Sequence, residues 1–263
     1  MPGSIETAGW TISLVRATSF DIPTEPIAPP GTIGETAHLP LNLALLRGHG
    51  RTLLVDGGFG PFTHILPGVV EDLDARLAEH GVAREDIDTV VLSHGDFDHV
   101  GGLVAGEWPD ALAPAFPGAR VAVARVVADR YRELDPDAEG NIATRILETV
   151  RGAGLLDELE DGAELAPGVR LVLAVGHAPG HSVVEVGEEY VHAVDVLHHA
   201  EHVPNPEWDA GFDQDPPVGL ATRKAWIERL AADGRRVSFA HLEGFGRIVR
   251  DAGGVARWAP DGA

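Results

Sequence analysis

Short apolar runs divide the chain into predicted strands. Residues 10–15 alternate between apolar and polar side chains, which is typical of a half-buried strand. Residues 88–93 contain a continuous apolar run, which is typical of a strand buried on both faces. The Gly-His-Gly turn at 48–50 joins two further runs into a predicted hairpin. The same reasoning predicts strands at 41–46, 52–55, 119–124, 169–175, 183–186, 190–196 and 236–240.

Apolar residues spaced three and four positions apart predict the helices. Val70, Leu73 and Leu77 recur at this spacing, and Gly81 follows them as a C-cap. The segment 222–232 has the same amphipathic pattern. Two further helices are predicted at 126–134 and 142–150, on either side of a polar break at 135–140.

The predicted elements form two halves, each of strands followed by helices. Because no repeat, low-complexity tract or long linker separates them, residues 1–263 are interpreted as one domain with a layered α/β body. Five prolines make 21–40 an irregular segment that is long enough to cover a site, and a second proline-rich loop is predicted at 204–217.

Composition excludes several classes of partner and chemistry. Twenty basic and 41 acidic residues give a net charge of −21, which repels nucleic acid and anionic membrane surfaces. No apolar run approaches the roughly 18 residues of a spanning helix, and the first residues do not resemble a signal peptide, so a cytoplasmic protein is expected. The chain has no cysteine, so any metal ligands must be His, Asp or Glu. The oligomeric state stays open, with a homodimer as one alternative.

The candidate chemistry begins directly after the predicted strand at 88–93. His94, Asp96, Asp98 and His99 lie within six residues of one another. In an extended chain, positions 94, 96 and 98 project to the same side, and His99 reaches the cluster from the other side. One or two metal ions would satisfy all four side chains, and the alternative is an ordinary solvated polar loop.

Further potential ligands stand at the ends of other predicted strands. His177 and His181 belong to a Gly/Pro turn, Asp195 follows the strand that begins at residue 190, and His241 follows the last predicted strand. Imidazole and carboxylate ligands suit zinc, manganese or iron, and a carboxylate can bridge two ions. These positions indicate a dinuclear site with room for a water molecule.

The order of these residues resembles the metallo-β-lactamase superfamily, whose pattern is His-x-His-x-Asp-His followed by a later His, an Asp and a last His. Asp56, in the segment 53–58, resembles the early strand-ending Asp of that superfamily, and 177–181 resembles its Pro-Gly-His turn. The resemblance spans about residues 41–250 and implies a four-layer αβ/βα sandwich with the metals in a cleft at one edge. The segments 205–208, 213–216, 222–223 and 246–248 resemble the branch of lactonases and methyl-parathion-type hydrolases.

Carried over position by position, the resemblance implies seven ligands for two divalent ions, zinc first, with manganese or iron as alternatives. The implied ligands are His94, Asp96 and His181 for the first ion, Asp98, His99 and His241 for the second, and Asp195 as the bridge. Asp96 departs from the superfamily, which has a histidine there. An added carboxylate makes the cluster less positive and favours harder ions such as manganese or iron more than the usual ligands do.

The resemblance implies hydrolysis of a small-molecule substrate, namely a lactone, ester or amide. A metal-bound hydroxide oriented by Asp98 would attack the substrate. The leaving group would be protonated by water or by His198, which stands where lactonases of the superfamily have a tyrosine. His177 is interpreted as a support of its turn and not as a ligand. Two alternatives stay open: an iron-dependent redox enzyme of the same fold, and a scaffold that binds a small molecule without turnover.

Overall fold

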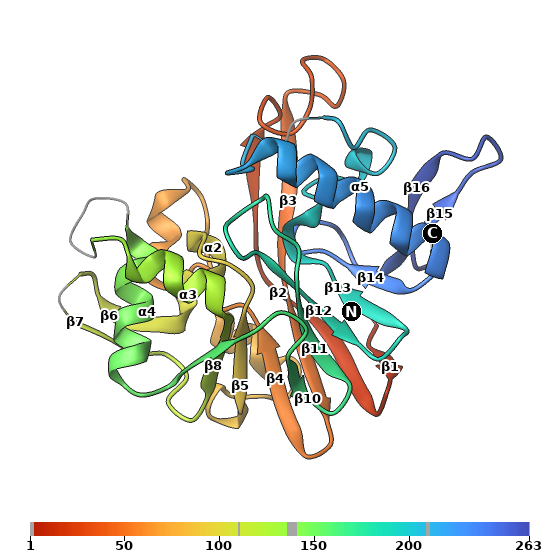
Figure 1. Ribbon diagram of the computed structural model, residues 1–263. Helices are drawn as coiled ribbons and strands as arrows, with labels where there is room; N and C mark the ends of the chain where they lie inside the picture. Colours follow the sequence, from red (N-terminus) through yellow and green to blue (C-terminus); the bar gives the residue numbers. More distant parts are fainter. Residues whose placement is uncertain (1–2, 110, 136–140, 209–210, 263) are drawn as a thin grey trace.

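Two seven-stranded sheets form the centre of the molecule (Figure 1). The computed structural model describes residues 3–109, 111–135, 141–208 and 211–262. The first sheet has the order β1-β2-β3-β4-β5-β8-β9, in which β4, β5, β8 and β9 are parallel to one another. Its strands are β1 (Ile5–Thr7), β2 (Trp10–Pro23), β3 (Thr36–Gly48), β4 (Arg51–Val55), β5 (Thr89–Leu92), β8 (Arg120–Ala124) and β9 (Leu156–Leu159).

The second sheet follows the order of the chain from β10 to β16. Its neighbouring strands are antiparallel except for β13 and β14, which are parallel because a helix crosses over between them. Its strands are β10 (Glu164–Ala166), β11 (Val169–Leu173), β12 (Ser182–Val186), β13 (Tyr190–His192), β14 (Arg236–Ser238), β15 (Gly246–Arg250) and β16 (Ala256–Pro260). A separate two-stranded sheet pairs β6 (Val104–Glu107) with β7 (Ala111–Pro114).

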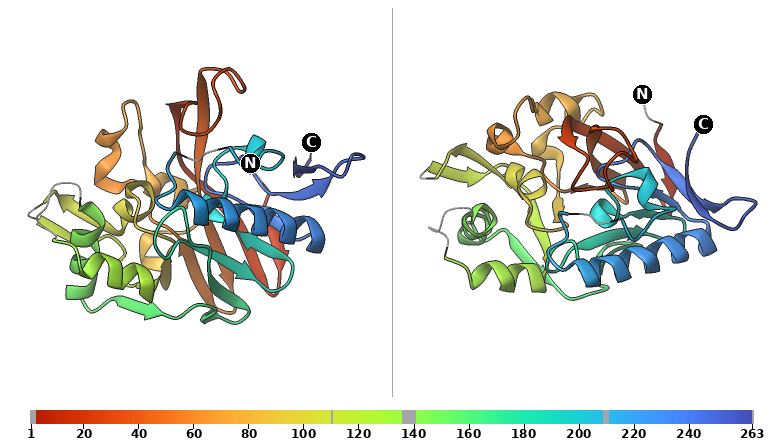
Figure 2. Two further views of the ribbon diagram at one scale, coloured as in Figure 1. Left: turned by 45° about the horizontal axis from the view of Figure 1, so that its top comes forward. Right: turned by 90° about the horizontal axis from the view of Figure 1, so that it is seen from above.

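Helices cover the outer sides of the two sheets, which confirms the predicted four-layer sandwich (Figure 2). The helices α3 and α4 pack on the first sheet, whereas α5 lies along the second. The helices are α1 (Leu73–Ala78), α2 (Phe97–Val100), α3 (Arg125–Arg132), α4 (Ile142–Gly152) and α5 (Pro216–Asp233). No helix within the described ranges is long and apolar enough to cross a bilayer.

The main apolar core lies between the two sheets. Trp10 and Tyr190, one from each sheet, are fully buried there, and the Trp10 indole donates a hydrogen bond to the Pro167 carbonyl. A second cluster lies under α5, where Trp226 and Leu230 pack with strand residues such as Val237. Burying a large apolar side chain contributes about 1.5–3 kcal/mol, so these clusters hold the layers together and fix the strand ends.

Capping residues explain where two helices differ from the predictions. The helix α5 begins at Pro216, six residues before the predicted start, because the Asp215 carboxylate accepts a hydrogen bond from the Val218 amide and proline suits the first turn. The predicted loop 204–217 is correspondingly shorter. The helix α1 begins only at Leu73, since Asp72 is its N-cap, and Val70 is 80% exposed and not part of its apolar face.

The segment predicted to be irregular at 21–40 is mostly a hairpin. The strands β2 and β3 pair as far as Pro23 with Thr36, so only 24–35 lies outside strands. Pro40 pairs with Ser19 within the ladder, where a proline is tolerated because this part of the hairpin extends past the shorter strands β1 and β4. The predicted strand at 190–196 ends at residue 192, because Val194 has a φ of +48° that no strand accommodates.

Candidate metal centre

Polar residues at the ends of strands from both sheets meet at one edge of the sandwich. Asp96 and Asp98 follow β5, and Asp195 follows β13. The backbone at Gly95 passes directly over the ring of Tyr131, where a Cβ atom would lie 2.2 Å from the phenolic oxygen. A larger residue between His94 and Asp96 would therefore have to displace the Tyr131 ring, which packs against the loop that carries both side chains.

The first half of the cluster consists of His94, Asp96 and His177. The Asp96 Oδ2 atom lies 3.6 Å from His94 Nε2 and 3.3 Å from His177 Nε2. The same two nitrogen atoms lie 3.7 and 3.5 Å from Oδ2 of Asp195. Four nitrogen and oxygen atoms that could bind a metal thus come together from four separate positions in the sequence.

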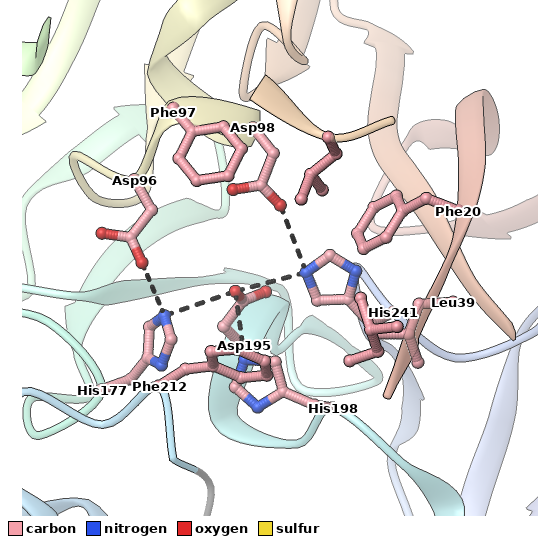
Figure 3. Close-up of a pocket in the computed structure, with 12 residues that line it drawn as sticks. Phe20, Leu39, Asp96, Phe97, Asp98, His177, Asp195, His198, Phe212 and His241 are labelled. Atoms are coloured by element: carbon pink, nitrogen blue, oxygen red, sulfur yellow. Dashed lines mark ion pairs between the residues drawn. The ribbon is translucent and has the colours of Figure 1, made fainter. Parts of the chain in front are cut away.

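The second half consists of Asp98, His99 and His241 and has the same form. The Asp98 Oδ2 atom lies 3.5 Å from His99 Nε2 and 3.6 Å from His241 Nε2. These nitrogen atoms lie 3.3 and 3.4 Å from Oδ2 of Asp195. One oxygen atom of Asp195 therefore belongs to both halves, and Figure 3 shows its carboxylate between them.

The two halves fit divalent ions. Ligands bound to zinc at about 2.1 Å in a tetrahedron are about 3.4 Å from one another, and the separations of 3.3–3.7 Å match this value. In the described part of the chain, Nε2 of His94, His99 and His177 and Oδ1 of Asp195 are buried without a hydrogen-bond partner. Since such atoms each cost about 1–3 kcal/mol, so many in one place indicate ligands for a metal.

Hydrogen bonds to the far ring nitrogens orient three of these imidazoles. His99 Nδ1 donates to Asp56 Oδ2 at 2.8 Å, and His241 Nδ1 donates to the Pro40 carbonyl at 2.9 Å. His94 Nδ1 lies 2.9 Å from Ser93 Oγ. Each contact directs Nε2 into the cluster, which is the usual arrangement behind metal-binding histidines. Asp56 thus acts behind the cluster and also accepts hydrogen bonds from the amide and hydroxyl of Ser93.

The structure places the two histidines of the turn differently: His177 Nε2 lies in the cluster, whereas both ring nitrogens of His181 have backbone partners. His181 Nδ1 donates to the Ala174 carbonyl at 2.9 Å, and its Nε2 accepts from the Asp195 amide at 3.2 Å. Burial and the neighbouring His94 hold the pKa of His181 well below its usual value, as expected for a neutral ring with both nitrogens engaged. The structure therefore keeps His181 behind the cluster and brings His177 into it. The residue types in the turn do not distinguish the two histidines. They differ only in the direction of their rings relative to Asp195, which the sequence does not give.

Opposite charges within the cluster hold its groups in their charged forms. Burial alone would raise the pKa of Asp195, but the imidazoles of His99 and His241 outweigh it and hold that pKa well below its usual value. Burial would lower the pKa of His99, and the carboxylates of Asp195, Asp98 and Asp56 raise it instead. The carboxylates therefore stay ionised, and a divalent cation that bound here would take the place of protons on the imidazoles.

An apolar pocket of about 130 Å³ leads to the cluster (Figure 3). Asp96, Asp98, His177, Asp195, His198 and His241 form its polar end. Its apolar walls are Phe20, Ile22, Leu39, Leu66, Phe97 and Phe212. The first three wall residues come from the β2–β3 hairpin, so part of the predicted irregular segment does border the site.

His198 lies at the polar end of this pocket. Its Nε2 atom is 3.5 Å from Asp195 Oδ2, and its ring is stacked on that of His241 with 5.5 Å between ring centres. Burial is the largest cause that lowers the pKa of His198 to about 4. Its imidazole is therefore neutral near pH 7 and has one N–H to donate.

Comparisons with known proteins agree with this geometry. Residues 39–241 match the Metallo-beta-lactamase superfamily. An N-acyl homoserine lactonase from a Bacillus species is 26% identical over 230 residues, which cover 80% of this chain and 84% of that protein. These matches support the lactonase-like branch that the sequence resembles.

Solved structures show the same fold. A dizinc quorum-quenching lactonase, in complex with an N-acylated homoserine product, has a TM-score of 0.85 at 21% identity, covering 99% of this chain and 97% of its own. A probable metal-dependent hydrolase from Staphylococcus aureus has a TM-score of 0.80 at 18% identity, covering 98% and 99%. With the family matched over most of the chain and a cluster of imidazoles and carboxylates at the strand ends, this protein belongs to the metallo-beta-lactamase superfamily and is a metal-dependent hydrolase.

Proposed function

We propose that this protein hydrolyses a small uncharged lactone, with esters and amides as related substrates, at a centre of two divalent ions. The observation that carries the proposal is the position of Asp195 Oδ2, which lies within 3.3–3.7 Å of ligand atoms from both halves of the cluster at the end of an apolar pocket. A lactone is proposed as the substrate because relatives of this chain are named as lactonases. Zinc is proposed because one structural neighbour is a dizinc enzyme. A cytoplasmic location belongs to the same proposal.

In this assignment two imidazoles and one carboxylate would hold each ion, and the Asp195 carboxylate would be shared between the two halves. The proposed ligands are His94, Asp96 and His177 for the first ion and Asp98, His99 and His241 for the second. When bound, the ions supply an acidified water molecule as the nucleophile and a Lewis acid for the substrate carbonyl. His177 thus replaces His181 in the ligand set that the sequence predicted.

The residues of the chain provide the remaining steps. Asp98 lines the pocket, orients the attacking water and accepts its proton. His198 stands opposite and donates its N–H to the oxygen that leaves when the acyl bond breaks. Phe97 and Phe212 exclude water from the reacting bond, which strengthens both polar interactions.

Charge favours an uncharged substrate over a phosphate ester. Three carboxylates of the cluster, Asp96, Asp98 and Asp195, contribute −3 against the +4 of two divalent ions. A histidine at position 96 would leave the centre with one more positive charge. Together with the net charge of −21, this weakens the attraction for anionic groups. The iron redox enzyme and the inactive scaffold are not favoured, since the relatives are named as lactonases and hydrolases.

The proposal is tested by metal analysis together with hydrolysis. We expect about two zinc ions per chain after purification without added metal, and proton release from five-membered lactones followed by pH-stat titration. Removal of metal with a chelator should abolish proton release, and added zinc should restore it. Two ions per chain without hydrolysis of any lactone, ester or amide would reject the proposed reaction, and iron as the bound metal would favour the redox alternative.

Replacement of His198 by alanine is expected to lower kcat about 100-fold while two ions stay bound, because a proton donor in the transition state contributes roughly 10²–10⁴-fold. The His198→Tyr variant, which restores a hydroxyl donor, should recover part of the loss. Steady-state kinetics and metal analysis of both variants check this expectation. A loss of metal in the alanine variant would instead make His198 a ligand.

A further inference from the structure

A buried ion pair lies directly behind His177. Arg223, from α5, donates through two of its nitrogens to Oδ2 of Asp213, at 3.2 Å each, and its Nε donates to the Pro206 carbonyl. Both charged side chains are at least 97% buried. A buried pair of this kind does little for stability relative to apolar residues of similar size, so its position calls for a functional explanation.

The second oxygen of Asp213 points at the proposed metal ligand. Asp213 Oδ1 lies 3.4 Å from His177 Nδ1, and within the described ranges both atoms are buried with no conventional hydrogen-bond partner. The far nitrogen of the ring, Nε2, is the one that faces Asp96 and Asp195. The imidazole of His177 therefore lies between a carboxylate at its back and the cluster at its front.

Backbone contacts hold Asp213 in this place. The amide of Gln214 donates to the carbonyl of His177 at 2.8 Å, and the amide of Asp215 donates to the carbonyl of Gly176 at 2.9 Å. Gly219 packs so closely that a Cβ atom there would lie 2.4 Å from Asp213 Oδ2. The loop before α5 and the turn that carries His177 thus form one rigid unit.

The arrangement repeats that of the other half of the cluster. Asp56 Oδ2 receives the Nδ1 proton of His99 at 2.8 Å, and Asp213 Oδ1 occupies the corresponding place behind His177, 3.4 Å from its Nδ1. In each half, the remaining histidine is backed by an uncharged oxygen, from Ser93 for His94 and from Pro40 for His241. Because position 96 is an aspartate and not a histidine, each half has two imidazoles and one carboxylate. In each half, one imidazole has a carboxylate behind it and the other has an uncharged oxygen.

We propose that Asp213, held by Arg223, is the positioning residue of His177 and makes the first metal-binding half equivalent to the second. This inference rests on the proposed dinuclear function. A histidine that binds metal through Nε2 carries its proton on Nδ1, and an acceptor for that proton fixes the ring and raises the basicity of Nε2. Arg223 compensates the charge of Asp213 in the buried surroundings. The two ions are then bound with similar affinity and are of the same kind.

Two double variants isolate the acceptor at position 213. Asp213→Leu with Arg223→Met removes the ion pair and the acceptor, while Asp213→Asn with Arg223→Met removes both charges but keeps an oxygen that accepts the His177 proton. Titration calorimetry of chelator-treated protein with zinc, in the presence of a competing chelator, measures each ion separately. We expect two ions of similar affinity in the wild type. In the leucine variant one of them should bind about 10–100-fold more weakly, whereas the asparagine variant should retain most of the affinity.

Each other result of this titration has a defined meaning. Asp215→Asn, in the same loop but exposed, should bind both ions as the wild type does. Equal binding in the two double variants, equal weakening of both ions, or failure of both double variants to fold would overturn the positioning role and leave the pair a structural one. Absence of zinc binding in the wild type would instead reject the proposed dinuclear function.

Discussion

Replacement of Asp195 by asparagine is expected to reduce bound zinc from two ions to one or none and to lower kcat/KM by about 10³-fold or more. The same oxygen atom lies within 3.7 Å of Nε2 atoms in both halves of the cluster, so one substitution removes a ligand from each ion. Metal activation of water and carbonyl is worth several kcal/mol, and about 4 kcal/mol corresponds to the stated loss in rate. An amide has nearly the volume of the carboxylate, so the packing around position 195 is conserved.

Elemental analysis and steady-state kinetics check this expectation. Asp129→Asn removes one negative charge from the exposed face of α3 and should leave metal content and turnover unchanged. Full occupancy by two ions in the Asp195→Asn protein would contradict the bridging assignment. If one ion stayed tightly bound and activity were partly retained, Asp195 would contribute more to the metal affinity of one half of the cluster than to that of the other.

Alanine at position 177 and alanine at position 181 are expected to have opposite effects. His177→Ala should lose one ion and at least about 100-fold in kcat, with little change in the unfolding temperature of the chelator-treated protein, because neither ring nitrogen of His177 has a conventional hydrogen-bond partner within the described residues. His181→Ala should keep both ions but lose about 3 kcal/mol of stability. It removes a fully buried ring and two hydrogen bonds, one of them from the backbone of Asp195.

Thermal unfolding and metal analysis of the two proteins separate these roles. For a chain of this length, about 3 kcal/mol lowers Tm by roughly 6–12 °C. The comparison is internally controlled, since both variants lose one imidazole from the same turn. If His181→Ala lost an ion while His177→Ala kept both, the ligand set predicted from the sequence would be right and the geometric assignment wrong.

These two histidines mark the limit of what the sequence predicts about the site. His94, Asp96, Asp98 and His99 could be predicted to lie together because a short loop after a buried strand keeps them together whatever the rest of the fold does. His177 and His181 stand four residues apart in one turn, and which of them faces the cluster depends on the amide of Asp195, which comes from a different loop. Asp213 could not be placed at all, because its partner lies 36 residues earlier.

The fold was predictable where hydrophobic pattern and turn residues agree. The hairpin of β3 and β4, the strands β5 and β8, and the helices α3 and α4 follow the predicted runs closely. Short strands with mixed burial were missed, such as β9, in which every residue is partly exposed, and the hairpin of β15 and β16. In these strands, pairing with neighbours distant in the sequence decides the conformation and outweighs local preference. The polar break predicted at 135–140 lies mostly outside the described residues.

The long β2–β3 hairpin borders the substrate pocket but provides none of the side chains proposed to bind metal. Its tip is fastened over the site by His202, which donates to the Ile27 carbonyl, and by the Gly211 amide, which donates to the Pro26 carbonyl. The side chains that it contributes to the pocket are apolar and bind no ion. Mutations of Phe20, Ile22 or Leu39 can therefore change which molecules enter while the reactive centre stays intact. Proteins with this fold can therefore evolve new substrates through changes in the β2–β3 hairpin, while the hydrolytic centre at the strand ends stays the same.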